Sequence, residues 1–312
     1  MRKALLFPSL LLCTPFAPAF AQDSEPAALE ATVLQGGLAR WSGADARECG
    51  IHGRRYAAVD GVCYYPVDMR AKTGAHEVAL WDAEGAQHDG TLHVEERECT
   101  ETAITLDRLE FIDVSEEDRA RAAKERVETL AAVKGARDVH PRFSLPLAPP
   151  AEGAGVKDRS DFCEKRLYND RIRSVHTGLD YLIGSGNPVT APADGTVVLA
   201  ADQFYSGKSV MVDHGGGLLT MAFHLGDIEV EKGDQVKRGE RLGTVGESGR
   251  TTGPHLHFGA RWHDQRIDAA ALLGEASRLP GIGEQPEQDA PDVEAVEADA
   301  QRTTTEDAAG EE

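Results

Sequence analysis

The sequence is poor in three features that would each assign it to a familiar class of protein. Basic residues are scarce: 33 Lys and Arg stand against 53 Asp and Glu, and the formal net charge of −20 argues against nucleic acid as a partner. After the first twenty residues, no apolar run is long enough to predict a membrane span. The cysteines are too dispersed for the paired spacing of a zinc ribbon. The 312 residues nevertheless leave room for two ordinary domains.

The first residues have the composition of a secretory signal. A basic start at residues 1–3 precedes an apolar stretch that ends in Ala19-Phe20-Ala21. We expect residues 1–21 to be a signal peptide, cleaved after Ala21, and the mature chain to be periplasmic or secreted. A membrane anchor is the alternative, but the stretch is short. It is also interrupted by three prolines, Pro8, Pro15 and Pro18.

Removal of this signal leaves four cysteines, Cys49, Cys63, Cys99 and Cys163. An even number in an exported chain favours two disulfides, and three pairings are possible. Cys49–Cys63 is the local option, which would leave Cys99–Cys163 to join the two halves of the chain. A free thiol at Cys163 is the alternative.

The hydrophobic pattern predicts a mostly β protein with two domains. Short alternating runs separated by glycine turns predict a β-sandwich-like accessory domain in residues 22–112, without evident chemistry. Residues 113–159 should form a linker, with a helix capped by Ser115 and a proline-rich stretch after it. Residues 160–273 again have glycine-broken strand patterns and predict a second, β-rich domain.

The remaining residues, 274–312, are predicted to be an acidic, disordered tail. From Glu284 to Glu312 there are eleven acidic residues against one arginine, Arg302, and few large apolar groups. Such a segment cannot bury enough surface to fold.

The chemistry of the second domain centres on histidines. In Thr251–Phe258, strand alternation puts His255 and His257 on one face and two apolar residues on the other. Upstream, His176 and Asp180 are four residues apart, a spacing that puts both on one face of a helix turn or of a strand. His224 lies between the two motifs. Imidazoles and a carboxylate are typical zinc ligands, so the set predicts a metal site.

At these residues the second domain resembles, from end to end, the LytM/lysostaphin-type zinc metallopeptidases, which cleave the peptide part of bacterial peptidoglycan. The similarity extends over about 110 residues and follows the family's motif order. The matching pieces are His176–Asp180, Ala191–Gly195, Asp213–Gly215, His224–Leu225, Gly233–Gly239 and Gly249–Phe258.

The resemblance implies one zinc ion bound by His176, Asp180 and His257, with His255 and His224 beside its open position. Two neutral imidazoles and one carboxylate leave a net positive zinc, which activates water and polarises the scissile carbonyl. We assign His255 as the general base and His224 as the group that stabilises the transition state, although the two roles could be exchanged.

Other family positions are less decisive. Arg166 aligns with a basic residue near the family's cleft, and His214 aligns with a structural histidine. Ala222 stands where the family usually has an aromatic residue, and Cys163 stands where a glycine is usual. These departures affect the shape of the cleft and leave the ligands in place.

The resemblance implies a zinc-dependent endopeptidase that acts on peptidoglycan stem peptides. The upstream sandwich and helix resemble the accessory region of exported Gram-negative members, which favours the D-Ala–diaminopimelate cross-link over a glycine bridge. The first domain would either block the cleft or position the substrate. One alternative is a catalytically inactive LytM-type regulator of cell-wall hydrolases, which would lack a ligand. Another is a biotinyl/lipoyl-like carrier barrel, which would need a lysine at a hairpin tip. The oligomeric state is left open.

Overall fold

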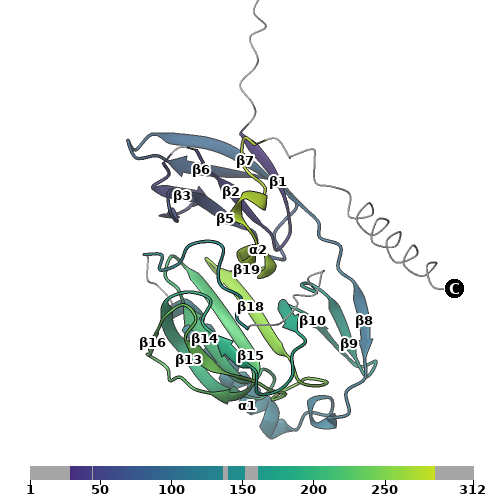
Figure 1. Ribbon diagram of the computed structural model, residues 1–312. Coiled ribbons are helices and arrows are strands. Elements are labelled where there is room, and N and C mark those ends of the chain that lie inside the picture. The colour runs from purple at the N-terminus through teal and green to yellow at the C-terminus, as the bar shows by residue number, and fades with distance from the viewer. Residues whose placement is uncertain (1–28, 44, 136–139, 152–160, 285–312) are drawn as a thin grey trace, which may run out of the picture.

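The computed structural model describes residues 29–43, 45–135, 140–151 and 161–284 (Figure 1). The expected signal peptide and residues 285–312 of the expected tail lie outside this part of the chain. None of the helices in the described ranges is both long and apolar enough to cross a membrane. The chain forms two β-rich bodies, one above the other in Figure 1, so the predicted mostly β fold class is confirmed.

The first body packs two sheets over one core. A five-stranded sheet in the order β1-β7-β6-β3-β4 faces a two-stranded sheet, β2-β5, and both supply residues to one buried cluster. β1 runs parallel to β7, and the other neighbours are antiparallel. Strand alternation fills this core: Val78, Leu80, Leu92 and Val94 are all buried. The strands are β1 (Glu30–Leu34), β2 (Leu38–Trp41), β3 (Glu48–Ile51), β4 (Arg54–Ala57), β5 (Cys63–Pro66), β6 (Gly74–Trp81) and β7 (Gln87–Glu95).

The chain then leaves the first body along an extended strand. β8 (Glu101–Ile104) is parallel to β9 (Lys165–Tyr168), which pairs with β10 (Ile172–Val175) in a three-stranded sheet. This small sheet stands beside the second body, to the right in Figure 1. The sequence pattern assigns β8 to the first domain, but this strand forms a sheet with β9 and β10 of the second domain.

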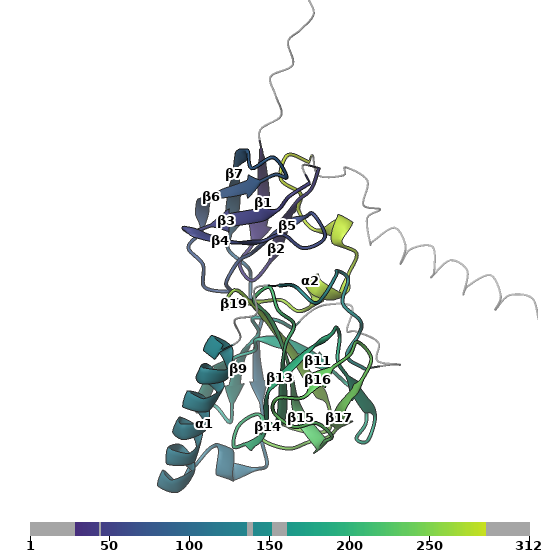
Figure 2. The same cartoon turned by 90° about the vertical axis from the view of Figure 1, so that its left-hand side faces the viewer.

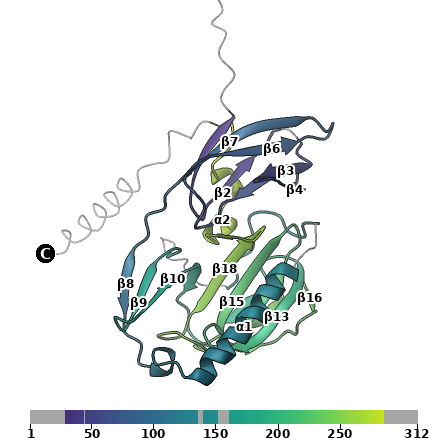
Figure 3. The same ribbon diagram turned by 180° about the vertical axis from the view of Figure 1, so that it is seen from behind.

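The linker helix α1 (Glu116–Gly135) follows a short 3-10 turn, Leu109–Phe111. Its start is capped as predicted, since the Ser115 hydroxyl accepts a hydrogen bond from the Asp118 amide (3.0 Å). Figure 3 shows the helix lying across the sheet of the second body. Val133 joins a buried cluster of sheet residues, and Gln203 donates a hydrogen bond to Thr129 (2.8 Å).

The second body is built on a nine-stranded antiparallel sheet. Its main path runs β11-β18-β15-β14-β13-β16; β12 pairs with β17, β17 also pairs with β15, and β19 pairs with β18. The strands are β11 (Gly178–Tyr181), β12 (Pro188–Thr190), β13 (Gly195–Gln203), β14 (Gly207–Asp213), β15 (Leu218–Ile228), β16 (Gln235–Val236), β17 (Arg241–Val245), β18 (Leu256–Trp262) and β19 (Gln265–Ile267). A short helix, α2 (Ala270–Leu273), and a 3-10 turn, Ala276–Arg278, complete it.

The two bodies are joined by continuous packing. Tyr64 of the first body packs on Trp262 of the second, with ring centroids 5.5 Å apart. Beyond α2 the chain returns to the first body, on the side seen in Figure 2. There Ile282 donates its amide proton to the Arg40 carbonyl (2.9 Å) and is buried in the first core. Residues 274–284, expected to belong to the tail, are thus ordered against the sandwich.

Candidate metal centre and active-site cleft

Two adjacent strands carry two of the predicted ligands. β11 and β18 are antiparallel, and their register sets Asp180 directly opposite His257. The residues on either side of His257, Leu256 and Phe258, point into the core and are fully buried. Gly178 makes this approach possible, because a Cβ there would lie 2.5 Å from the Phe258 carbonyl oxygen and 2.7 Å from His257 Nε2.

His176 reaches the same point from the loop between β10 and β11. The four-residue spacing suggested that His176 and Asp180 share one face of a strand or of a helix turn, but His176 lies in neither element. Instead, main-chain hydrogen bonds hold the loop: His176 donates to the Glu164 carbonyl (2.8 Å), and Cys163 donates to the His176 carbonyl (2.9 Å). The ring Nδ1–H donates to the Asp161 carbonyl (3.0 Å), which leaves Nε2 free to act as a ligand.

Three donor atoms converge. His176 Nε2 lies 2.8 Å from His257 Nδ1 and 3.0 Å from Asp180 Oδ1, and the last two atoms are 3.0 Å apart. Within the described ranges, these residues form the one cluster of three His, Cys, Asp or Glu side chains able to hold a metal ion. Donors of a tetrahedral zinc are about 3.4 Å apart, so small outward shifts would fit the cluster to the ion.

The electrostatics of the cluster favour a cation. Burial opposes a charge on His176, but Asp161 and Asp180 outweigh it and raise the pKa of His176 to about 9. Burial also opposes the Asp180 charge, yet hydrogen bonds with His176 and His257 hold the pKa of Asp180 below its usual value. Burial lowers the pKa of His257. The site thus stabilises positive charge next to a stable carboxylate, and a metal ion would supply that charge in place of the proton on His176 Nε2.

A second layer of residues orients the Asp180 carboxylate. Arg166 donates from Nη2 to Asp180 Oδ2 (2.8 Å) and to Asp161 Oδ2 (3.0 Å), and from Nε to Glu164 Oε2 (2.6 Å). The Thr102 hydroxyl of β8 donates to Glu164 (2.6 Å). Asp180 thus keeps Oδ1 toward the donor cluster. The sequence pointed to Arg166 only as a basic residue near the cleft and gave no signal for Asp161, Glu164 or Thr102, since isolated polar residues have no periodicity.

A β-bulge brings His224 to the cleft. Pairing between β14 and β15 shifts between Lys208↔Leu225 and Val210↔Ala222, so the strand gains a residue and re-aims its side chains. His224 takes a positive φ of 63° there. Its Nδ1–H donates to the Ser248 carbonyl (2.8 Å). Burial, with the neighbouring imidazoles His255 and His257, lowers the pKa of His224 to about 3.

His255 lies at the entrance to β18. Its Nδ1–H donates to the Gly253 carbonyl (2.9 Å), and its Nε2 lies 3.6 Å from Asp180 Oδ1. The rings of His255 and His224 have centroids 4.9 Å apart. Both imidazoles therefore hold Nδ1 on a main-chain carbonyl, and Nε2 is the nitrogen available for proton transfer in each.

The five predicted site residues line one cleft of about 400 Å³. The small sheet contributes Thr102, Arg166 and Ser174 to its lining, and the second body contributes Tyr205 and Arg250. Phe223 stacks on His257, with centroids 5.4 Å apart and planes 5° from parallel. It provides an aromatic surface next to Ala222, where the family usually has its aromatic residue.

His214 lies away from this cleft. It is buried, its Nδ1–H donates to the Asp194 carbonyl (2.8 Å), and the Thr220 hydroxyl is 2.8 Å from its Nε2. Burial lowers the pKa of His214 to about 4. These contacts agree with the structural role that its sequence context suggested.

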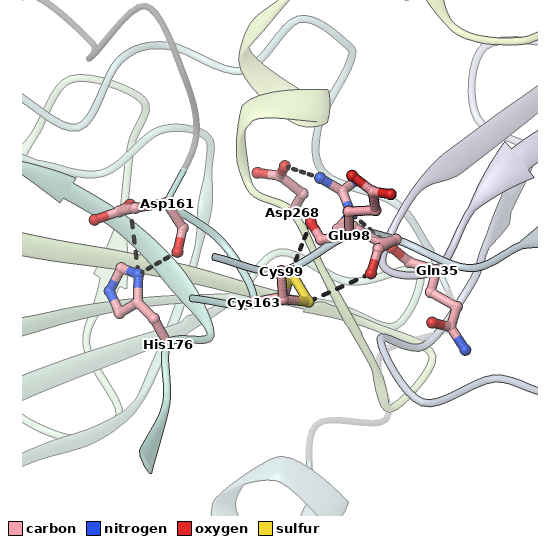
Figure 4. The surroundings of a disulfide bond; sticks show 8 residues. Gln35, Glu98, Cys99, Asp161, Cys163, His176 and Asp268 are labelled. Carbon is pink, nitrogen blue, oxygen red and sulfur yellow. Dashed lines mark hydrogen bonds and ion pairs between the residues drawn. A yellow bond between two sulfur atoms is a disulfide. The ribbon is translucent and has the colours of Figure 1, made fainter. Parts of the chain in front are cut away.

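The structure contains both disulfides of the local pairing, Cys49–Cys63 and Cys99–Cys163. Figure 4 shows Cys163 close to Asp161 and His176. Cys163 has a φ of 71°, a region that favours glycine, which matches the residue usual in the family. The second disulfide therefore anchors the segment that carries Asp161 and Arg166 to the strand leaving the first body.

Comparison with known proteins places the family match in the second body. The model of Peptidase family M23 matches residues 174–269. Peptidoglycan DD-endopeptidase ShyA of Vibrio cholerae is 41% identical over 123 residues, which cover 39% of this chain and 29% of ShyA. DD-carboxypeptidase/endopeptidase Mpg of Neisseria meningitidis is 39% identical over 98 residues, covering 31% of this chain and 23% of Mpg. The match thus spans less than a third of these relatives' length.

The similarity to a solved structure extends beyond the matched segment. A crystal structure described as an M23 peptidase from Pseudomonas aeruginosa is 28% identical, with a TM-score of 0.59. The match covers 77% of this chain and 95% of that one. The fold is therefore shared over most of the described residues and not only over the nine-stranded sheet.

Proposed function

We propose that this chain is a zinc-dependent endopeptidase that hydrolyses peptide cross-links of peptidoglycan, because its residues 174–269 match the model of Peptidase family M23. The names of ShyA and Mpg, a peptidoglycan DD-endopeptidase and a DD-carboxypeptidase/endopeptidase, support this substrate class. We further propose the D-Ala–diaminopimelate cross-link as the bond, and the periplasm or the exterior of the cell as the location.

The observation that carries the proposal is the convergence of three buried donor atoms beside two imidazoles. The donors His176, Asp180 and His257 lie within 3.0 Å of one another, and His224 and His255 line the same cleft. An inactive regulator of the family would lack part of this set. A carrier barrel would not require the histidines at all.

Zinc held by this cluster would act as a Lewis acid on the scissile carbonyl. The remaining chemistry belongs to the protein. His255 is the general base in our proposal: its Nδ1–H is held by Gly253, so Nε2 accepts the proton of the attacking water and later returns it to the leaving amine.

His224 faces the developing oxyanion in this proposal. Its Nδ1–H is held by Ser248, so it can donate to an oxyanion only with a second proton, on Nε2. Negative charge that develops on the substrate favours that protonated form, which opposes the effect of burial. The hydrogen bond from Arg166 Nη2 to Asp180 Oδ2 keeps the Asp180 carboxylate oriented throughout.

The experiment is digestion of purified cross-linked peptidoglycan with the mature chain, followed by mass spectrometry of the fragments. We expect cross-linked dimers to be converted to monomers, the reaction to stop with a chelator and resume with added zinc, and Asp180→Ala to be inactive. Zinc-loaded protein that leaves the dimers intact would contradict the proposed function. Cleavage that Asp180→Ala leaves unchanged would contradict the proposed metal site.

A further inference from the structure

A second cleft, of about 370 Å³, adjoins the catalytic one. Its walls come from three parts of the chain: Met69 and Arg70 after β5, the strands β9 and β10, and Arg266 of β19. Four residues line both clefts, and they belong to β9, β10 and the loop that carries His176. They are Arg166, Ser174, Val175 and Thr177. An extended peptide bound across the catalytic cleft therefore has a direct path into the second one.

The lining of this second cleft is cationic on a protein that is otherwise strongly acidic. Arg70, Lys165 and Arg173 are exposed, and among the described residues none of their side chains makes a hydrogen bond or an ion pair. The one acid in the lining is Glu101, which lies opposite Lys165 in the register of β8 and β9. Arg70, Lys165 and Arg173 therefore outnumber the single acid in this lining, although the whole chain carries a formal charge of −20.

The wall supplied by the first body is held rigidly to the second. Asp68 accepts from Arg266 through both oxygens, at 2.7 Å from Nη2 and 3.1 Å from Nε, and also accepts from the Arg266 amide (2.9 Å). Met69 donates its amide proton back to the Arg266 carbonyl (3.1 Å), and Arg70 donates its own to Asp68 (2.9 Å). The backbone of Arg70 is therefore fixed beside the peptidase domain before any ligand arrives, which reduces the entropic cost of binding.

We propose that this cleft is a binding subsite for a carboxylate of the peptide substrate, with Arg70, Lys165 and Arg173 as its contacts. The inference rests on the proposed function for the substrate class, and on charge complementarity and adjacency for the subsite itself. A guanidinium group matches the planar geometry of a carboxylate and forms paired hydrogen bonds with it. The first domain then takes part in substrate selection, since Arg70 belongs to it.

The test compares Arg70→Ala/Arg173→Ala with wild type on two probes. One probe is a cross-linked muropeptide dimer with free carboxylates, and the other is the same dimer with these carboxylates amidated. For the free dimer we expect the KM of the double variant to rise roughly 10-fold with kcat unchanged, because each exposed ion pair contributes at most about fivefold. For the amidated dimer we expect wild type and variant to have the same KM.

The matched control is Arg119→Ala/Arg126→Ala, which removes the same charge from exposed positions of α1, outside both clefts. It should leave both KM values unchanged. Equal KM increases in the two double variants, or an equal increase for the amidated dimer, would overturn the subsite.

A binding measurement separates this inference from the proposed function. The dissociation constant of an uncross-linked muropeptide monomer, which has carboxylates but no cross-link to cleave, can be measured by calorimetry with the zinc-loaded protein. We expect about tenfold weaker binding by Arg70→Ala/Arg173→Ala than by the control. If wild type binds the monomer with this dependence but cleaves no dimer, the endopeptidase proposal fails and the subsite stands. Equal binding by both double variants contradicts the subsite, whatever the protein hydrolyses.

Discussion

The donor cluster and the layer of residues around it are held in place in different ways. Asp180 and His257 are cross-strand neighbours in the nine-stranded sheet, whose continuous hydrogen bonding fixes them directly. The surrounding layer, Asp161, Glu164 and Arg166, belongs to a short segment outside that sheet. It is held by pairing with β8 and by the Cys99–Cys163 disulfide. Both β8 and Cys99 belong to the segment of chain that leaves the first body.

The two bodies therefore stabilise different parts of the site. The peptidase sheet alone supplies two of the three donors and both cleft imidazoles. The third donor, His176, and the residue that orients Asp180 are stabilised by contacts that extend to Thr102 of β8. The inner group consists of the three donor residues and the two cleft imidazoles, and substitutions in it should abolish catalysis. The outer group consists of Asp161, Glu164 and Arg166, and substitutions in it should weaken metal binding without abolishing it.

The largest effect is expected from the cleft imidazoles. His255→Ala and His224→Ala should each lower kcat by roughly 10²–10⁴-fold, because they remove proton transfer or oxyanion stabilisation. Zinc content should stay at one ion per chain in both. Steady-state kinetics and metal analysis check the two statements together, and a metal-free His255→Ala protein would show that this residue is a ligand.

The next effect concerns Arg166. Replacement of Arg166 by Met leaves Asp161, Glu164 and Asp180 without their shared cation, so zinc affinity should fall about 10- to 100-fold. Arg171→Met is the matched control, because Arg171 is exposed and, within the part of the chain that the structure describes, forms its ion pair with the surface residue Asp113 alone. Competition with a chromophoric chelator measures both affinities. Equal affinities in the two variants would mean that the outer layer does not tune the metal site.

The two disulfides allow a smaller contrast. Cys99→Ser/Cys163→Gly removes the tether formed by the Cys99–Cys163 disulfide, and glycine suits the φ of 71° at position 163. Zinc affinity should therefore fall by less than about tenfold. Cys49→Ser/Cys63→Ser removes the disulfide inside the first core and should lower the melting temperature without changing zinc release. Zinc release to a chelator, followed below both melting temperatures, distinguishes them. Identical release rates would refute the tether's role at the site.

A fourth prediction concerns stability alone. Burial lowers the pKa of His214 to about 4, below its value of 6.5 in an unfolded chain. The unfolded state therefore binds more protons between these values, and stability should fall as pH drops from 6.5 to 4, by up to about 3 kcal/mol. His214→Gln should show a shallower pH dependence in chemical denaturation and keep zinc and activity at neutral pH. An unchanged slope would mean that His214 is not held neutral by the fold.

The sequence predicted the inner group well because its signals are local. His-x-His on a strand places His255 and His257 on one face, and the core positions of Leu256 and Phe258 follow from the same alternation. The geometry of His176 was not predictable: its spacing from Asp180 suggested a shared face, whereas main-chain hydrogen bonds to residues 163 and 164 position it from a loop.

The outer group could not be predicted for a physical reason. β8 and β9 are parallel neighbours about sixty residues apart in the chain, and no local pattern encodes such a pairing. The cationic cleft is likewise assembled from the segment after β5, from β9 and β10, and from β19. The ordered return of the chain at Ile282 depends on the core of the first body, whereas the charge pattern near Glu284 suggested only a solvated tail.

The most direct test of the account is the metal content of Asp180→Ala compared with wild type and His224→Ala, by mass spectrometry of the folded proteins. The account predicts one zinc per chain in wild type and His224→Ala, and none in Asp180→Ala, because loss of the carboxylate leaves two imidazoles as the protein's ligands. Full zinc content in folded Asp180→Ala would contradict the assignment of the His176, Asp180 and His257 cluster as the metal centre.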